Sequence, residues 1–346
     1  MQACGGVGGV ALSHLLGQDG LLAAPSSAVT GPPSRTHHQP RAKNIIYIYL
    51  EGGPSQMDLY DPKPMLNQLD GQALPESMLK NMRFAFLAKE SARIMGTPRT
   101  FKKYGQCGME LSDLLPHIGS IADDICLVRS MHTDQFNHVP GQLLMNTGSA
   151  ISGRPSMGSW LSYGLGSGSK NLPEFVVLIC VGRGVPGGSA SWASGFLPSK
   201  YSGVMFRNEG APVLNLDNPT GFTAAMQERN IRGVAELNAL RHAEVRDPEI
   251  DSRIAAYELA FRMQSAAPEL MDLSSESKET LELYGCDPKV PSFARACLLA
   301  RRMVERGVRF INIYNEGWDA HSDVAGNVRN NCAKTDKASA ALVKDL

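Results

Sequence analysis

Residues 309–323, RFINIYNEGWDAHSD, decide the class of fold that this sequence predicts. The apolar run at the start of the segment is typical of a buried β-strand. It leads into a glycine-containing loop that carries Glu316, Asp319, His321 and Asp323. Because ligands of open α/β sheets bind just beyond the carboxyl ends of the strands, this loop is the expected position of a metal-binding or acid–base site.

A similar pattern lies near the other end of the chain. Residues 44–58, NIIYIYLEGGPSQMD, join a second apolar strand to a loop with two adjacent glycines and the carboxylates of Glu51 and Asp58. Both faces of this strand are apolar, as expected for a parallel strand at the centre of a sheet. The sequence therefore predicts that two distant segments bring their loops to one edge of a sheet and form one site there.

Other segments complete the prediction of an α/β fold with a central, mostly parallel sheet flanked by helices. Further strands are predicted at residues 84–86, 125–130 and 175–179. Helices are predicted at residues 111–121, 141–147, 156–164, 293–306 and 331–346. Another helix is predicted to begin at Asp247-Pro248, because an aspartate N-cap followed by proline is a helix start signal. The glycine-, proline- and serine-rich segment 182–221 is expected to form long surface loops.

The composition excludes several classes of protein. The 346 residues include 34 lysines and arginines and 34 aspartates and glutamates, so no overall field favours nucleic acid or an anionic membrane. The hydrophobic content of 43% is that of an ordinary globular protein. The 7 cysteines are scattered and include no C-x-x-C pair, which argues against a zinc ribbon or a dense disulfide framework.

The first 43 residues are predicted to be a leader and linker, and residues 44–346 one domain. Residues 3–24 are rich in small and apolar residues, but Gln18 and Asp19 interrupt them. This stretch is too short and too interrupted for a transmembrane span, and it is similar to an export signal without a positively charged start. The alternative is a disordered or docked leader. Residues 25–41 are proline-rich and are expected to be a linker.

Two loops contain the candidate functional side chains. In the loop 131–142, His132, Asp134, Asn137 and His138 could bind a metal or an anion, or could merely satisfy backbone groups of a tight loop. In Asp319-x-His321, an extended backbone would place both side chains on one face, although such pairs are often structural. Asp58 could equally be a turn cap. The dinucleotide fingerprint, the P-loop, the G-x-S-x-G elbow and the H-E-x-x-H motif are all absent.

Four segments of the chain together resemble the DUF1501 proteins. They are residues 44–64 (NIIYIYLEGGPSQMDLYDPKP), 131–158 (MHTDQFNHVPGQLLMNTGSAISGRPSMG), 196–203 (FLPSKYSG) and 306–327 (RGVRFINIYNEGWDAHSDVAGN). The resemblance covers residues 44–346. It implies a protein of the type abundant in Planctomycetes and a place in the alkaline phosphatase/sulfatase superfamily. The implied fold is an alkaline-phosphatase-like three-layer sandwich with a metal site at its strand ends.

The resemblance also implies a set of metal ligands. Glu51 occupies the place where sulfatases put a first metal-binding aspartate after strand one, and Asp319 and His321 match the acidic and histidine loop of the family. With Asp58, these residues are expected to hold a divalent metal, Ca²⁺ or Zn²⁺.

The catalytic residues implied by the resemblance lie in one segment. His138 occupies the nucleophile position of the sulfatase motif, and Gln142 occupies its arginine position. A histidine cannot be converted to the formylglycine that sulfatases use, so sulfatase chemistry by that route is not expected. Asn137 or His138 is expected to face the ester, and either to attack it or to stabilise charge on its oxygens.

Two functions from different classes follow from the resemblance. The first is an exported metal-dependent hydrolase that acts on sulfate or phosphate esters of small molecules or polysaccharides. The second is an inactive exported protein that binds carbohydrate or a surface with the same scaffold. A third reading is a fragment that does not fold stably, because the domain is expected to be incomplete after Leu346. The leader resembles the rear part of a twin-arginine signal, which implies a periplasmic or extracellular location.

Overall fold

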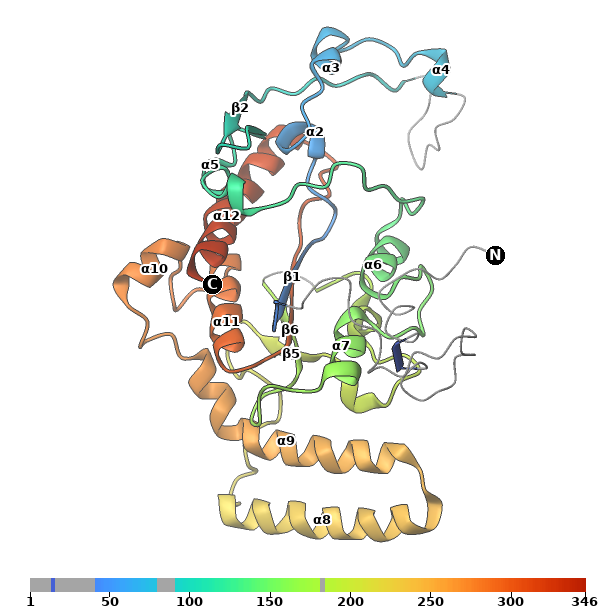
Figure 1. Ribbon diagram of the computed structural model, residues 1–346, viewed down its shortest axis with the longest axis vertical. Helices are drawn as coiled ribbons and strands as arrows, with labels where there is room; N and C mark the ends of the chain where they lie inside the picture. The colour runs from blue at the N-terminus through green and yellow to red at the C-terminus, as the bar shows by residue number, and fades with distance from the viewer. Residues whose placement is uncertain (1–13, 16–40, 80–90, 181–183) are drawn as a thin grey trace, which may run out of the picture.

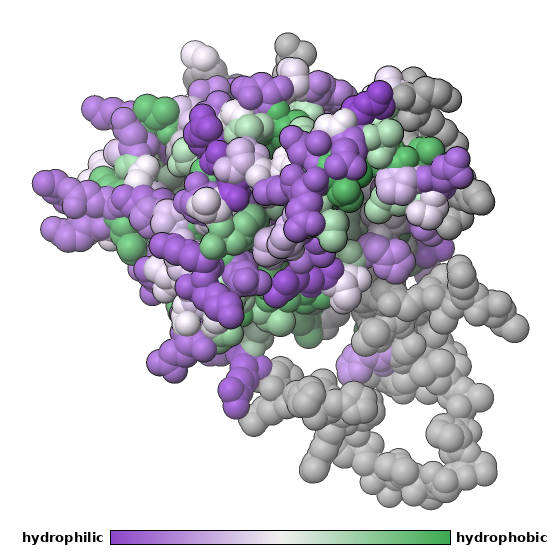
Figure 2. Space-filling model, turned by 90° about the horizontal axis from the view of Figure 1, so that it is seen from above, coloured by the Kyte–Doolittle hydropathy of each residue, from purple (hydrophilic) through white to green (hydrophobic). Residues whose placement is uncertain are grey.

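The computed structural model describes residues 14–15, 41–79, 91–180 and 184–346. Most of the predicted export leader and the predicted strand at residues 84–86 lie outside these residues. Among the described helices, none is long and apolar enough to cross a membrane. Hydrophilic and hydrophobic residues are mixed over the face seen in Figure 2.

The core of the protein is a four-stranded parallel sheet with the strand order β1-β6-β4-β5. The strands are β1 (Ile45–Leu50), β6 (Phe310–Asn315), β4 (Phe175–Ile179) and β5 (Val204–Arg207). Three of these strands were predicted from their apolar runs. Because every pair is parallel, the carboxyl ends of all the strands lie at the same edge of the sheet. The two segments singled out in the sequence, β1 and β6, are direct neighbours.

The described helices and the remaining strands have the following bounds: α2 (Gln56–Leu59), α3 (Pro64–Gln68), α4 (Glu76–Leu79), β2 (Phe101–Tyr104), β3 (Met109–Ser112), α5 (Pro116–Gly119), α6 (His138–Thr147), α7 (Met157–Leu165), α8 (Ala224–Val245), α9 (Pro248–Met271), α10 (Lys278–Tyr284), α11 (Phe293–Glu305) and α12 (Val324–Asp345). Short 3-10 turns occur at Ala122–Asp124, Gly188–Trp192 and Ser199–Tyr201. The chain is therefore an α/β protein, as predicted.

Helices cover both faces of the sheet. Figure 1 shows α11 and α12 on one side of the strands and α6 and α7 on the other, with the α8–α9 pair projecting away from them. Alternation along the strands explains this arrangement, because successive side chains point to opposite faces. Ile311 and Ile313 pack into the core cluster with α11, whereas Phe310 and Tyr314 pack with Trp192 on the other face.

Local signals in the sequence explain where several helices begin and end. The side chain of Asp247 accepts a hydrogen bond from the backbone N–H of Glu249 at the start of α9, and Ser156 caps α7 in the same way. After α11, Gly307 has a φ of 82°, the left-handed conformation that favours glycine. These capping residues confirm the predicted starts of the two helices and the predicted end of α11.

Four predictions from local patterns were wrong. Strand β1 was expected at the centre of the sheet, but among the described strands it pairs only with β6, and its residues are only partly buried. Residues 125–130 form no strand, and Val128 is 56% exposed because no described strand lies beside this apolar run. Residues 111–121 contain the end of the β2–β3 hairpin and then α5, because Pro116 is tolerated only in the first turn of a helix. The segment predicted to be all loop contains β5, which pairs with β4 at the edge of the sheet.

A buried charge cluster joins α11 to the connection between α9 and α10. Glu276 accepts hydrogen bonds from Arg301 and from Arg302, both at 2.5 Å. The side chains of Glu276 and Arg302 are only 9% and 6% exposed. A charge that is removed from water in this way needs its partner. The cluster therefore fixes the connection between α9 and α10 against α11.

Candidate functional site

The candidate site begins where β1 and β6 end side by side. The backbone N–H of Glu51 donates to the carbonyl of Asn315 at 2.8 Å, which extends the pairing one residue beyond the strand. The backbone N–H of Trp318 then donates to the carbonyl of Glu51 at 3.2 Å. The expected meeting of the two loops at one edge of the sheet is thus confirmed.

Gly52 allows these two loops to approach each other closely. Its φ is 92°, and a Cβ atom added to it would lie 2.2 Å from the backbone nitrogen of Asp319. Any other residue would therefore push the Asp319 loop away from β1. The neighbouring Gly53 also has a positive φ, of 78°, but open space surrounds the position of its missing Cβ.

Replacing Gly52 by alanine should destabilise the fold more than replacing Gly53. Both variants lose about 1 kcal/mol because alanine disfavours a positive φ, and only Gly52→Ala adds a clash, which costs about 1–3 kcal/mol more. Urea unfolding curves of the two variants would measure the difference. Equal unfolding free energies would show that the contact between Gly52 and Asp319 does not constrain the loops.

His138 bridges the two acidic residues of the site. It is the first residue of α6, which places its ring at the edge of the sheet. Its Nδ1 lies 2.6 Å from Oε1 of Glu51, and its Nε2 lies 2.8 Å from Oδ2 of Asp319. A neutral imidazole has only one N–H donor, so two carboxylates can both be satisfied only when both ring nitrogens carry a proton. Each ring nitrogen of His138 thus faces one carboxylate, and the ring links Glu51 to Asp319.

Asp319 also binds a second histidine. Nε2 of His321 lies 2.7 Å from the same Oδ2 atom that faces His138. Desolvation acts to raise the pKa of Asp319, but the hydrogen bonds from His321 and His138 outweigh it and hold this pKa below its usual value. Asp319 is therefore a carboxylate anion at neutral pH. The side chain of His321 is 85% exposed, whereas that of Glu51 is only 11% exposed.

The structure does not bring all of the expected site residues into this cluster. Asp58 accepts a hydrogen bond from the hydroxyl of Thr97, so it is engaged away from the two histidines. Asn137 precedes α6 as its N-cap and is exposed beside His138, and its side chain makes no capping hydrogen bond. Four of the seven residues expected from the sequence thus share one hydrogen-bonded cluster: Glu51, His138, Asp319 and His321.

Gln142 occupies the arginine position of the sulfatase motif, where a side chain would contact the ester. In the structure it is buried and does not face solvent. Its exposure is 0%, and its amide donates to Oγ of Ser191 at 2.6 Å and accepts from the N–H of Gly187. Gln142 lies about one helical turn after His138 on α6. Its side chain faces the loop of Gly187 and Ser191 instead of the end of the sheet.

Sequence reasoning missed a buried polar network behind the site. The amide of Asn312 donates to the hydroxyl of Tyr314 at 2.8 Å and to Oδ1 of Asn146 at 3.1 Å. The Tyr314 hydroxyl donates to the same Asn146 oxygen at 2.8 Å. Because Asn146 lies on α6 and the other two lie on β6, the network ties the helix of His138 to the strand of Asp319. The only signal in the sequence was an asparagine inside an otherwise apolar strand.

The donor atoms of the cluster do not fit a divalent metal as they stand. Carboxylates and imidazoles are suitable ligands for Zn²⁺ or Ca²⁺. Here, however, both nitrogens of His138 and one nitrogen of His321 point at carboxylate oxygens at hydrogen-bond distance. Within the described ranges, no group of three or more His, Cys, Asp or Glu side chains is arranged to hold a metal ion.

Removing divalent metals should therefore leave the stability of this chain unchanged. A metal that binds only the folded state would raise the unfolding temperature, and a chelator would reverse that gain. We expect equal unfolding temperatures by scanning fluorimetry with EDTA, with Ca²⁺ and with Zn²⁺. A drop of several degrees in EDTA that added Ca²⁺ or Zn²⁺ restores would contradict this expectation and would support a metal centre.

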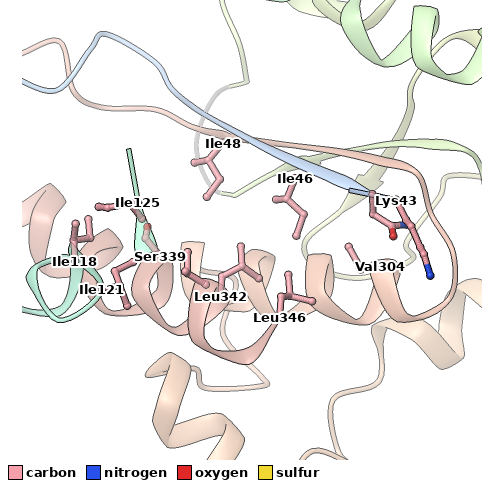
Figure 3. A pocket seen from close by; sticks show the side chains of 12 residues that line it. Lys43, Ile46, Ile48, Ile118, Ile121, Ile125, Val304, Ser339, Leu342 and Leu346 are labelled. Atoms are coloured by element: carbon pink, nitrogen blue, oxygen red, sulfur yellow. The ribbon is translucent and has the colours of Figure 1, made fainter. Parts of the chain in front are cut away.

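An apolar groove lies apart from the candidate site. The groove has a volume of about 620 Å³ and runs between β1 and α12. Figure 3 shows Ile46 and Ile48 of β1 on one side of this groove and Leu342 of α12 on the other. None of the expected site residues lines it. The functional argument therefore rests on the cluster at the strand ends and not on this groove.

Fold and site together define an α/β protein that carries a histidine–carboxylate cluster at the carboxyl edge of a parallel sheet. The model of the family described as "Protein of unknown function (DUF1501)" matches residues 42–346. The chain belongs to this family. No curated protein and no solved structure matches it.

Proposed function

We propose that this protein hydrolyses esters of sulfate or phosphate by acid–base catalysis at the cluster of Glu51, His138, Asp319 and His321. The observation that carries the proposal is the pair of hydrogen bonds from His138 and His321 to one oxygen of Asp319. A carboxylate that orients an exposed imidazole is the arrangement that general bases require.

His321 is the proposed general base. When its Nε2–H donates to Asp319, its Nδ1 carries a free lone pair, and the side chain is 85% exposed. That nitrogen can take a proton from a water molecule as the water oxygen bonds to the sulfur or phosphorus atom. The bond to the ester oxygen then breaks, and the leaving alkoxide or phenolate takes a proton from solvent. His138 has a different role, because both of its nitrogens already face carboxylates. Its ring links Glu51 to Asp319 and holds the two carboxylates in place.

The start of α6 is the proposed place for the anionic group of the ester. The backbone N–H groups of His138 and Val139 lie in the first turn of this helix, where the helix dipole favours negative charge. The exposed carboxamide of Asn137 lies beside them. A sulfate or phosphate bound there would lie next to the histidine–carboxylate cluster.

The same proposal includes an alkaline-phosphatase-like fold and an exported protein. A parallel sheet with a site at its carboxyl edge supports the first part, as does the family resemblance. The second part rests on the composition of residues 3–24. A divalent metal, although implied by the resemblance, is not required for the steps described above.

Turnover of chromogenic esters tests the proposal directly. We expect the purified protein to hydrolyse an aryl sulfate or an aryl phosphate, and the variant His321→Gln to lose most of this activity while it keeps its unfolding temperature. Glutamine keeps a polar side chain of similar length but cannot act as a base at neutral pH. A folded protein that turns over neither ester, or a fully active His321→Gln variant, would refute the proposal.

A binding protein without catalysis is the second candidate. It is favoured by the position of Gln142, which is buried where the family resemblance would place a cationic side chain facing the ester. The contacts of His138 also favour binding over catalysis. Both ring nitrogens face carboxylates, so neither has a free lone pair for attack. Binding of a sulfated glycan without release of sulfate would identify this function.

A further inference from the structure

A second cavity, of about 490 Å³, lies at the opposite end of the sheet from the candidate site. Its lining includes Phe175 and Val204, the first residues of β4 and β5, and part of α9. The histidine–carboxylate cluster lies beyond the carboxyl ends of the strands, so the two places are separate. We infer that this second cavity binds a saccharide, and the inference does not depend on the proposed hydrolysis.

Ser162, near the end of α7, supplies a hydroxyl group without a partner. The residue is 2% exposed, and its Oγ atom makes no hydrogen bond within the described residues. Ser162 also lines the cavity. Buried polar groups are nearly always hydrogen-bonded, and leaving one unpaired costs free energy. A bound molecule with a hydroxyl group would satisfy this atom.

Glu174 supplies a carboxylate with which no side chain of the described residues forms a hydrogen bond or an ion pair. Desolvation raises its pKa, although the nearby charges of Lys200 and Arg309 oppose that shift. Neither cation forms an ion pair with it, because Arg309 donates to backbone carbonyls and Lys200 lies over the ring of Tyr201. The cavity thus presents an acceptor in Glu174 and a donor in Lys200 that do not satisfy each other.

Aromatic side chains form part of the wall. The rings of Tyr163 and Tyr201 are nearly perpendicular, at 84°, with their centroids 5.2 Å apart. Tyr163 is 40% exposed, so a face of its ring is open to a ligand. Rings of this kind offer an apolar surface with a polar hydroxyl at its end.

A pyranose ring matches this combination of hydrogen-bond donors, an acceptor and aromatic side chains. Each sugar hydroxyl can donate to Glu174 and accept from Lys200 at the same time, and the apolar face of the ring can lie against an aromatic side chain. A purely cationic ligand would be repelled by Lys170, Lys200 and Arg262, which all line the cavity. A volume of about 490 Å³ lies in the usual range for small-molecule sites.

Saturation-transfer NMR with maltose, cellobiose and lactose tests this inference on the full chain. We expect at least one disaccharide to bind, and the variants Ser162→Ala and Glu174→Gln each to weaken binding about fivefold, as the loss of one hydrogen bond predicts. Neither variant should lower the unfolding temperature, because Ser162 has no partner and the Glu174 charge is desolvated. Ser265→Ala, on α9 outside the cavity, is the matched control and should bind normally.

Three results would overturn the inference. The first is the absence of transfer to all three disaccharides. The second is binding that neither Ser162→Ala nor Glu174→Gln weakens, since the sugar would then lie elsewhere. The third is loss of stability in both variants, since the two groups would then serve the fold and not a ligand. The candidate hydrolase site can fail its own test without affecting any of these results.

Discussion

Replacing Asp319 by asparagine should lower ester turnover by about 10³–10⁴-fold, the effect of the same change in an aspartate that orients a catalytic histidine. Asparagine has the same shape, but one end of its side chain is an N–H donor. The Asp319 oxygen that faces both His138 and His321 accepts from two rings at once, which a neutral amide does poorly. His321 would then lose the preference for the tautomer that leaves Nδ1 free. Steady-state rates with an aryl sulfate or aryl phosphate would measure the loss.

The control for this variant is Asp134→Asn in the exposed loop before α6. It makes the same chemical change near the site, and we expect its turnover to equal that of the unchanged protein. A variant Asp319→Asn with normal turnover would show that the contacts to the two histidines are structural. If both variants fold and neither loses activity, the catalysis lies elsewhere.

Replacing Glu276 by alanine should destabilise the fold by about 3 kcal/mol, the usual cost of breaking a buried ion pair from one side. Arg302 is 6% exposed and would keep only weak neutral contacts, to Oγ of Ser275 at 3.5 Å and to the carbonyl of Glu269 at 3.1 Å. Its charge would then be buried without a counter-ion. Chemical denaturation at neutral pH would give the difference in unfolding free energy.

The matched control is Glu305→Ala. Glu305 also pairs with Arg301, at 2.7 Å, but its side chain is 48% exposed. Exposed pairs contribute about 0–1 kcal/mol, so this variant should unfold almost like the unchanged protein. Equal effects of the two substitutions would contradict the role given to burial.

The pH dependence of stability gives an independent check on Glu276. Desolvation raises its pKa, but the hydrogen bonds from Arg302 and Arg301 outweigh it, so the folded-state pKa lies below the usual value. The stabilisation is then complete above the unfolded-state pKa of about 4.3 and is lost as the pH falls through the lower folded value. The variant Glu276→Gln should lack this part of the acid dependence.

The sequence predicted three of the four strands of the parallel sheet and missed β5, and it placed β1 at the centre although β1 is an outer strand. The run 175–179 is apolar on both faces and the run 310–315 is mostly so, as expected of strands covered by helices, so β6 and β4 were identifiable. β5 is short and lies at the edge of the sheet, where half of the backbone pairing is absent, and its residues do not stand out in a glycine-rich segment. The apolar run at 125–130 was predicted to be a strand but forms none. Its residues alone do not show whether a neighbouring strand is available for pairing.

The sequence predicted which residues lie in the candidate site, but not the hydrogen bonds between them. The sequence placed Glu51 and Asp319 on loops at the ends of two strands, and it singled out His138 and His321. It could not show that His138 would lie between the two acids, since it is 181 residues from Asp319 along the chain. Nor could it show that Asp58 would bind Thr97, because that contact depends on how a separate loop folds back.

By itself the sequence determined which segments form the central strands, where α7 and α9 start, and which family the chain belongs to, because these depend on residues a few positions apart. The tertiary structure alone decided which polar groups touch. It joined Glu51, His138 and Asp319 at the sheet edge, and it buried Gln142 against Ser191. The physical reason is that a hydrogen bond between distant residues requires atoms to meet within about 3 Å. That separation depends on the packing of whole elements and leaves no trace in the local pattern.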